Sequence, residues 1–243
     1  MRLEGKIAVV TGAASGFGEG IARKFVAEGA KVVVADRDGA GAERAAAALG
    51  KNAVGVRADV TNARDVQGMV AAAVERFGSL DVLVNNAGTL SRKAALTVTA
   101  DDMRPEFETN VLGLVRVINA MLPLLRRSDA ARVVNVSSTS AVFTHTADPS
   151  TMFAQSHDSF AYAASKAAVT MLTLKYANAF RADPALADAK VNAVTPGYVA
   201  TDLNGFQGVR TTEQGARASV RYATLGPDGP SGGFFDDEGP VPW

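Results

Sequence analysis

Cysteine is absent from the 243 residues of the chain, and only two histidines, His145 and His157, are present. The lack of cysteine excludes a disulfide scaffold, a thiolate nucleophile and a cysteine zinc site. With so few histidines we expect no metal site. The 25 basic residues equal the 25 acidic ones, so the formal net charge is zero. A neutral chain has no bulk electrostatic attraction to nucleic acid or to an anionic membrane, and we expect neither as a partner.

Long hydrophobic runs are also missing. No uncharged apolar stretch reaches the length of about 18 residues that a membrane-spanning helix needs. The first apolar run, Ile7–Val10, is too short for the apolar region of a signal peptide. We therefore expect a cytoplasmic protein, and the length of the chain suits a single domain over residues 1–243.

Short runs rich in valine and isoleucine alternate along the chain with helical patterns. The predicted strands are Ile7–Thr11, Lys31–Asp36, Ala53–Ala58, Leu80–Asn85, Arg132–Ser137, Lys190–Thr195 and a short one near Phe234. Apolar residues at consecutive positions are typical of strands buried on both faces, as in a parallel sheet. The alternation predicts an α/β fold: one doubly wound domain with a central parallel sheet of about seven strands and helices on both faces.

A glycine-rich turn follows the first predicted strand. Its glycines are Gly12, Gly16 and Gly18, and a helix is expected directly after them. Glycine permits a tight turn, a close approach of the backbone to a pyrophosphate, and close packing of a helix on a sheet. The free N–H groups at the start of that helix attract an anion. This pattern favours a dinucleotide site, although a purely structural turn has the same glycines.

Polar residues stand at the carboxyl ends of several predicted strands. Asp36 ends the second strand, Asp59 follows the third, Asn86 follows the fourth, and Ser138 follows the fifth. Ligands of doubly wound sheets bind outside the carboxyl ends of the strands, where a carboxylate such as Asp36 accepts hydrogen bonds from ribose hydroxyls. The sequence therefore predicts one nucleotide site along this edge of the sheet.

Tyr162 and Lys166 are four residues apart in a helical segment and share a face of it. A free tyrosine, with a pKa of about 10, is a poor base at neutral pH. A nearby cation favours the phenolate and lowers that pKa. We expect Lys166 to act in this way, so that Tyr162 exchanges a proton with an alcohol or carbonyl oxygen.

Taken in order, these motifs resemble the short-chain dehydrogenase/reductase family over nearly the whole chain. The matching segments are Thr11-Gly12-x-x-x-Gly16-x-Gly18, Asn85-Asn86-Ala87-Gly88, Asn110, Ser137-Ser138, Tyr162-x-x-x-Lys166 and Pro196-Gly197. From about Val98 onward, the chain is similar to a bacterial carbonyl-reductase-like branch of that family. The resemblance implies a Rossmann-type fold and an oxidoreductase that transfers a hydride between a nicotinamide cofactor and a ketone or secondary alcohol.

The resemblance also implies roles for particular residues. Tyr162 is the expected acid/base, Ser138 orients the substrate oxygen, and Asn110 holds a water that links Lys166 to solvent. Lys166 also holds the nicotinamide ribose, while the segment from Pro196 to Thr201 holds the carboxamide. The cofactor-binding residues expected on all these grounds are Gly12, Ser15, Gly16, Phe17, Gly18, Asp36, Arg37, Asp59, Val60, Asn86, Ala87, Gly88, Tyr162, Lys166, Pro196, Gly197, Val199 and Thr201.

The choice between NAD and NADP depends on Asp36 and Arg37. The Asp36 carboxylate suits the ribose hydroxyls of NAD and repels the 2′-phosphate of NADP, whereas the Arg37 guanidinium would pair with that phosphate. We expect NAD, with NADP as the alternative, because Asp36 ends the strand and Arg37 has room to turn into solvent.

The interval Thr139–Phe160 is longer than in the commonest family members. Long loops in compact domains are usually functional or disordered, and we interpret this one as a wall of the pocket for a hydrophobic or aromatic ketone. A loose surface insertion is the alternative.

The segments Val111–Leu125 and Ala161–Leu174 are apolar nearly all round, which predicts a homodimer or homotetramer; a monomer follows if the insertion covers them.

Two other functions stay open, a dinucleotide-binding regulator with little turnover and a nucleotide-sugar epimerase.

Overall fold

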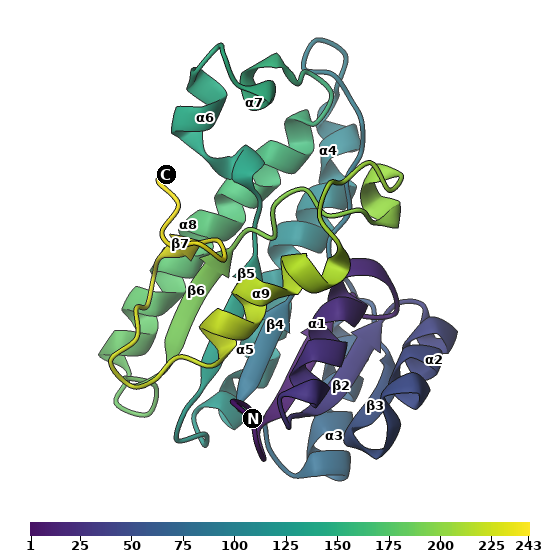
Figure 1. The fold of residues 1–243 in the computed structure, drawn as a ribbon, viewed down its shortest axis with the longest axis vertical. Coiled ribbons are helices and arrows are strands. Elements are labelled where there is room, and N and C mark those ends of the chain that lie inside the picture. Colours follow the sequence, from purple (N-terminus) through teal and green to yellow (C-terminus); the bar gives the residue numbers. More distant parts are fainter.

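The computed structural model describes residues 1–243 and contains one sheet of seven parallel strands (Figure 1). The strands are β1 (Ile7–Thr11), β2 (Lys31–Asp36), β3 (Ala53–Arg57), β4 (Val82–Asn85), β5 (Arg132–Val136), β6 (Lys190–Val194) and β7 (Phe234–Phe235). The predicted strands are confirmed, with ends that differ by at most two residues. Their order is β3-β2-β1-β4-β5-β6-β7, so the direction of winding reverses between β1 and β4, where such sheets open a crevice.

Helices cover both faces of the sheet, which confirms the doubly wound fold. One face carries α1 (Gly16–Ala27), α2 (Gly39–Leu49) and α9 (Thr212–Ala223), and the other carries α3 (Ala63–Phe77), α5 (Leu114–Leu125) and α8 (Phe160–Ala182). Single 3-10 turns lie at Gly50–Asn52, Thr139–Ala141 and Asp202–Asn204.

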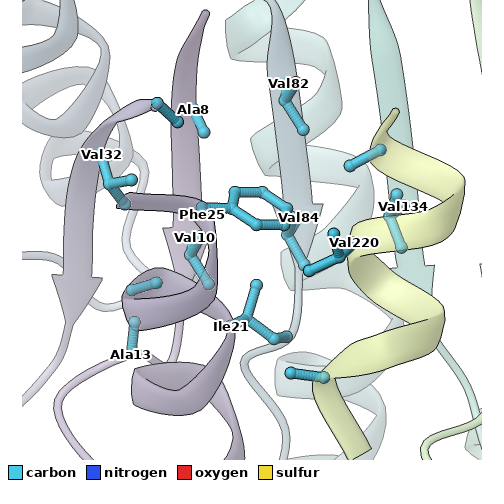
Figure 2. Close-up of a cluster of buried hydrophobic side chains, with 14 of the residues drawn as sticks. Ala8, Val10, Ala13, Ile21, Phe25, Val32, Val82, Val84, Val134 and Val220 are labelled. Carbon is cyan, nitrogen blue, oxygen red and sulfur yellow. The ribbon is translucent and has the colours of Figure 1, made fainter. Parts of the chain in front are cut away.

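Alternate residues of each strand point to opposite faces, so each strand supplies two cores. Val10 and Val84 belong to the core under α1 and α9, whereas their neighbours Val9 and Leu83 belong to the core under α3 and α5. Phe25 of α1 reaches into the first core between β1 and β4 and is fully buried (Figure 2). The consecutive apolar residues of the strands are therefore explained by burial on both sides.

A continuous helical stretch connects β4 with β5. It consists of α4 (Ala100–Phe107), a π-helical turn (Glu108–Gly113) and α5. By length and composition alone this stretch is apolar enough to cross a membrane, a feature that the sequence analysis did not predict. Half of its most apolar window is buried inside the fold, where Ile118 and Met121 pack on the sheet. The stretch is thus a core helix of the sheet's second face.

The long interval before Tyr162 is more ordered than a plain loop. It forms α6 (Phe143–Ala147) and α7 (Met152–Gln155), which stand together at one end of the molecule beyond β5 (Figure 1). The segment is tied to the chain after β4: Arg92 and Asp158 form an ion pair of 3.0 Å, and the Ala95 N–H donates to the His157 carbonyl. These contacts hold the insertion over the carboxyl edge of the sheet.

Candidate active site

One large cavity, of about 1180 Å³, lies at the carboxyl ends of the strands. Every cofactor-binding residue expected from the sequence lines it, and so do Ser138, Tyr162 and Lys166. Asn110 is the one expected site residue outside its lining; it lies behind the wall, beside a small cavity that it shares with Lys166. Residues from the carboxyl ends of six strands, β1 to β6, and from α8 are thereby brought to one space.

The glycine-rich turn has the geometry that its glycines predict. Gly12 has a φ of +64°, and a Cβ there would lie 2.8 Å from the Cα of Ala87. A Cβ on Gly18 would lie 2.0 Å from the Gly12 carbonyl oxygen, so no larger residue fits without moving the turn. Ser15 precedes α1 without capping it through its side chain. The first N–H groups of α1 are therefore available to an anion at the cavity.

Asn86 fastens the turn to the end of β4. Its Nδ2 donates to the carbonyl oxygens of Thr11 and Gly12, both at 2.8 Å. In return the Thr11 hydroxyl oxygen accepts from the backbone N–H groups of Asn86 and Ala87 at 3.0 and 3.1 Å. These bonds show that Asn86 shapes the cavity through the backbone of the turn.

Asp36 stands at the end of β2 beside the turn. Its carboxylate accepts from the backbone N–H groups of Ala14 and Asp38, each at 3.0 Å, and it also lines the cavity. Asp59 accepts from the backbone and hydroxyl of Thr61; these bonds and the nearby Arg37 hold the pKa of Asp59 below its usual value. Arg37 itself is exposed at the rim. The Asp36 carboxylate, fixed by two N–H groups, therefore lines the cavity, whereas the Arg37 guanidinium has access to solvent.

Tyr162 and Lys166 project from the first turns of α8 into the cavity. The Lys166 Nζ lies 5.6 Å from the centroid of the Tyr162 ring and donates to the Val136 carbonyl oxygen at 2.8 Å. Burial lowers the pKa of Lys166 to about 8, because a buried ammonium loses its hydration. The helical spacing has therefore placed the pair together, as expected.

The proton affinity of Tyr162 differs from the expectation. Burial raises the pKa of Tyr162 to about 12, a hydrogen bond with Ser138 acts in the opposite direction, and the charge of Glu106 raises it further. The sequence analysis expected Lys166 to lower this pKa, but here the ammonium is engaged with the Val136 carbonyl. Burial of the phenol, which disfavours the charged phenolate, is the larger effect.

Asn110 lies in the π-helical turn after α4 and is almost fully buried. Its side chain donates to the Thr89 carbonyl and the Ser165 hydroxyl and accepts from the Thr89 N–H, at 2.8 to 3.0 Å. A Cβ on Gly88 would lie 3.3 Å from the Asn110 Oδ1 and 3.5 Å from the Lys166 Nζ. Asn110 thus fixes the backbone after β4, and its Oδ1 and the Lys166 Nζ both lie close to Gly88.

The insertion expected to form a wall of the substrate pocket reaches the cavity, and so does the chain after β6. The insertion contributes residues from both sides of α7, and the chain after β6 contributes Tyr198 and the turn Asp202–Asn204. Motif reasoning missed several lining residues, among them Glu108, Thr109, Thr61 and Ala163. The only sequence feature that points to these residues is that they lie next to, or within a few positions of, the motif residues. It also missed Glu106, a buried acid behind the wall, which no pattern in the sequence distinguishes from a surface glutamate.

Comparisons with known proteins agree with this geometry. The profile of the short chain dehydrogenase family matches residues 6–210. The chain is 37% identical over 226 residues to L-fucose dehydrogenase of Oryctolagus cuniculus, covering 92% of this chain and 72% of that protein. It is 31% identical to the 3-oxoacyl-(acyl-carrier-protein) reductase of Vibrio cholerae, covering 84% and 77% of the two chains.

A solved structure is similar as well. The 3-ketoacyl-(acyl-carrier-protein) reductase of Brucella melitensis, complexed with NADH, superposes with a TM-score of 0.81 at 30% identity over 96% of this chain and 97% of its own. Fold, motif order and these matches together define the class: the chain belongs to the short-chain dehydrogenase family of oxidoreductases.

The close approach at Gly18 gives a testable prediction. We expect Gly18→Ala to lower the free energy of unfolding by about 1–3 kcal/mol, since the new methyl group displaces the Gly12 carbonyl. Urea unfolding measures the effect. Gly68→Ala in α3 is the matched control: a Cβ there meets nothing within 4 Å, so the better helix former adds about 0.5–1 kcal/mol. Equal effects of the two substitutions would contradict the assigned packing.

Proposed function

We propose that this protein is an NAD-dependent oxidoreductase that transfers a hydride between the cofactor and a ketone or secondary alcohol. One observation carries the proposal: Ser138, Tyr162 and Lys166 line the same cavity as the glycine-rich turn and Asp36. The glycine cradle, the uncapped start of α1 and the fixed carboxylate of Asp36 fit a dinucleotide. The NADH complex of the similar Brucella melitensis structure supports the same cofactor.

A bound nicotinamide supplies or accepts the hydride. The chain's own residues then handle position and the proton. In carbonyl reduction the Tyr162 hydroxyl donates its proton to the substrate oxygen, and in alcohol oxidation the phenolate takes that proton back. Ser138 holds the same oxygen by a hydrogen bond. Lys166, close to the Tyr162 ring, favours the phenolate when its ammonium turns from the Val136 carbonyl towards the cavity. Asn110 holds the backbone of Thr89 and the hydroxyl of Ser165, which are the chain neighbours of Gly88 and Lys166, and it holds a relay water.

The mouth of the cavity favours an apolar substrate. Met152 of the insertion, and Tyr198 and Leu203 of the opposite segment, line the cavity with 62%, 40% and 45% of their surface exposed. Nearby polar groups already bind one another. Arg92 pairs with Asp158, and Asn204 donates to the Val199 carbonyl. The apolar surface is what a ligand would cover, so we propose a ketone with a hydrophobic or aromatic substituent.

The experiment is a panel of ketones and secondary alcohols of increasing size, run with NADH and NADPH in parallel. Turnover of carbonyl substrates with NADH supports the proposal, and kcat/KM is expected to rise with apolar size, about fourfold for each buried CH2 group. A protein that binds NADH but turns over nothing in the panel is the regulator considered from the sequence. An epimerase would convert nucleotide sugars without net change of the cofactor.

Tyr162→Phe tests the assigned acid/base. We expect turnover to fall by about 10²–10⁴-fold while NADH still binds, because the phenol donates the proton and the ring packing is retained. Steady-state kinetics and NADH fluorescence titration measure the two effects. A variant that keeps more than about a tenth of the turnover with chemistry rate-limiting would remove Tyr162 from the mechanism.

Asp36→Ala tests the cofactor preference. In the wild type we expect a higher kcat/KM with NADH than with NADPH, since a carboxylate about 4 Å from a 2′-phosphate repels it by about 1–4 kcal/mol. Removal of the carboxylate is expected to move the ratio of efficiencies towards NADPH. The measurement is kcat/KM for both cofactors on one ketone. A wild type that prefers NADPH would show that Arg37 governs the site.

We further propose that residues 1–243 act as one cytoplasmic domain that assembles into a homodimer or homotetramer through α5 and α8. Leu112, just before α5, and Met171 of α8 remain 48% and 55% exposed, so the insertion does not cover them as the monomer alternative requires. Light scattering at micromolar concentration is expected to give a multiple of the 25.1 kDa chain mass. A single species at the mass of one chain would contradict the assembly.

A further inference from the structure

Only three charged residues of the chain are buried: Glu106, Arg132 and Lys166. Arg132 lies on β5 and is satisfied by main-chain oxygens, since its guanidinium donates to the carbonyls of Leu225, Ala131 and Asp188. Lys166 is at the cavity and has no carboxylate within salt-bridge distance; its ammonium donates to a carbonyl instead. Glu106 is therefore the single buried acid, and none of the roles described so far uses it.

Glu106 stands on α4, with 2% of its surface exposed. One carboxylate oxygen, Oε1, accepts a hydrogen bond from the backbone N–H of Ser91. The other oxygen, Oε2, is buried without a protein partner, and so is the neighbouring Ser91 hydroxyl. Ser91 lies between Leu90 and Arg92, which both line the cavity. Glu106 thus holds the wall of the cavity from behind.

The helix that carries Glu106 packs against α8, which carries Tyr162 and Lys166. The negative charge of Glu106 raises the pKa of Tyr162, so the charge acts at the phenol across this helix contact. Lys166, whose Nζ lies 5.6 Å from the centroid of the Tyr162 ring, has the opposite sign, and its ammonium favours the phenolate when it turns from the Val136 carbonyl towards the phenol. The phenol of Tyr162 therefore lies under the influence of one buried cation and one buried anion.

Stability does not account for a carboxylate at this position. A buried charge that lacks a full set of hydrogen bonds is costly, and well-packed apolar side chains are often at least as stabilising. Costly polar groups of this kind concentrate where activity requires them.

We propose that Glu106 is a positioning residue of the active site: it fixes the Leu90–Arg92 wall through Ser91, and its charge opposes that of Lys166 and keeps Tyr162 in the phenol form. This inference rests on the proposed function, because it assigns a protonation state to the acid/base of that reaction. The phenol is the form that donates a proton to a carbonyl. Glu106 therefore favours carbonyl reduction near neutral pH and delays alcohol oxidation to alkaline pH.

Other charged groups around α4 have partners of their own. On the preceding loop, Arg92 pairs with Asp158 and Lys93 with Asp102; on the following turn, Glu108 pairs with Arg116. On α4 itself, Asp101 and Arg104 pair at the surface. On α8, Tyr162 and Lys166 are the titratable groups at the cavity. The substitution Glu106→Gln therefore changes the buried charge and leaves these surface pairs intact.

The test compares pH profiles of alcohol oxidation and carbonyl reduction for the wild type and Glu106→Gln. Glutamine keeps an oxygen for the Ser91 N–H and removes the charge. Without the anion the phenol ionises more easily, so the rising limb of oxidation and the falling limb of reduction both move to lower pH, by on the order of one unit, a tenfold change in the ionisation constant. The melting temperature is expected to stay equal or to rise.

Asp101→Asn is the matched control, since it removes one negative charge from the exposed side of the same helix and is expected to leave both profiles in place. Glu106→Leu removes the acceptor of the Ser91 N–H as well; its profile should move like that of Glu106→Gln, with a higher KM for the carbonyl substrate.

A merely structural role predicts that Glu106→Gln lowers the melting temperature with no displacement of either limb. That result, or an equal displacement in Asp101→Asn, would overturn the inference while the proposed function stands. A wild type without turnover of any carbonyl or alcohol would overturn both.

Discussion

The close contact between the turn after β1 and the turn after β4 is the constraint on which the site depends. Gly18 brings α1 to the Gly12 carbonyl, and Asn86 bonds the same carbonyl from the neighbouring strand end. Because the sheet reverses its winding between β1 and β4, this contact lies at the point where the crevice opens. A side chain at Gly12 or Gly18 would push the two turns apart and displace the residues of both turns that line the cavity.

Exclusion of water determines the pKa values of Tyr162 and Lys166, which line the same cavity. Burial raises the pKa of Tyr162 to about 12 and lowers that of Lys166 to about 8, because burial disfavours the charged form of each group. A charge that is buried near Tyr162 therefore changes the pKa of the phenol more than the same charge would in water. The balance between Lys166 and the buried Glu106, rather than Lys166 by itself, then sets the protonation state of Tyr162 under our proposal.

The insertion before α8 forms one side of the mouth of the cavity. It uses its polar groups to fasten itself to the loop after β4, through Arg92 and Asp158 and through the His157 carbonyl, and it presents Met152 to the cavity. One similar protein is named for a sugar and others for acyl-carrier-protein substrates. Met152, Tyr198 and Leu203 line the cavity but lie outside the motifs that identify the family, which is why the family alone does not name the substrate.

The sequence by itself determined the strands and the motif residues that line the cavity. Runs such as Lys31–Asp36 are apolar at consecutive positions, which only a doubly covered strand can bury, and parallel strands deliver the residues after them to one edge. Tertiary structure alone decided three further points. Hydrogen bonds to Thr89, after β4, and to Ser165 of α8 placed Asn110 behind the cavity wall. Packing of α4 on α8 buried Glu106. Exclusion of water, not the Tyr162–Lys166 spacing, governed the pKa of Tyr162. Burial and desolvation arise from elements distant in the chain, so a local pattern does not contain them.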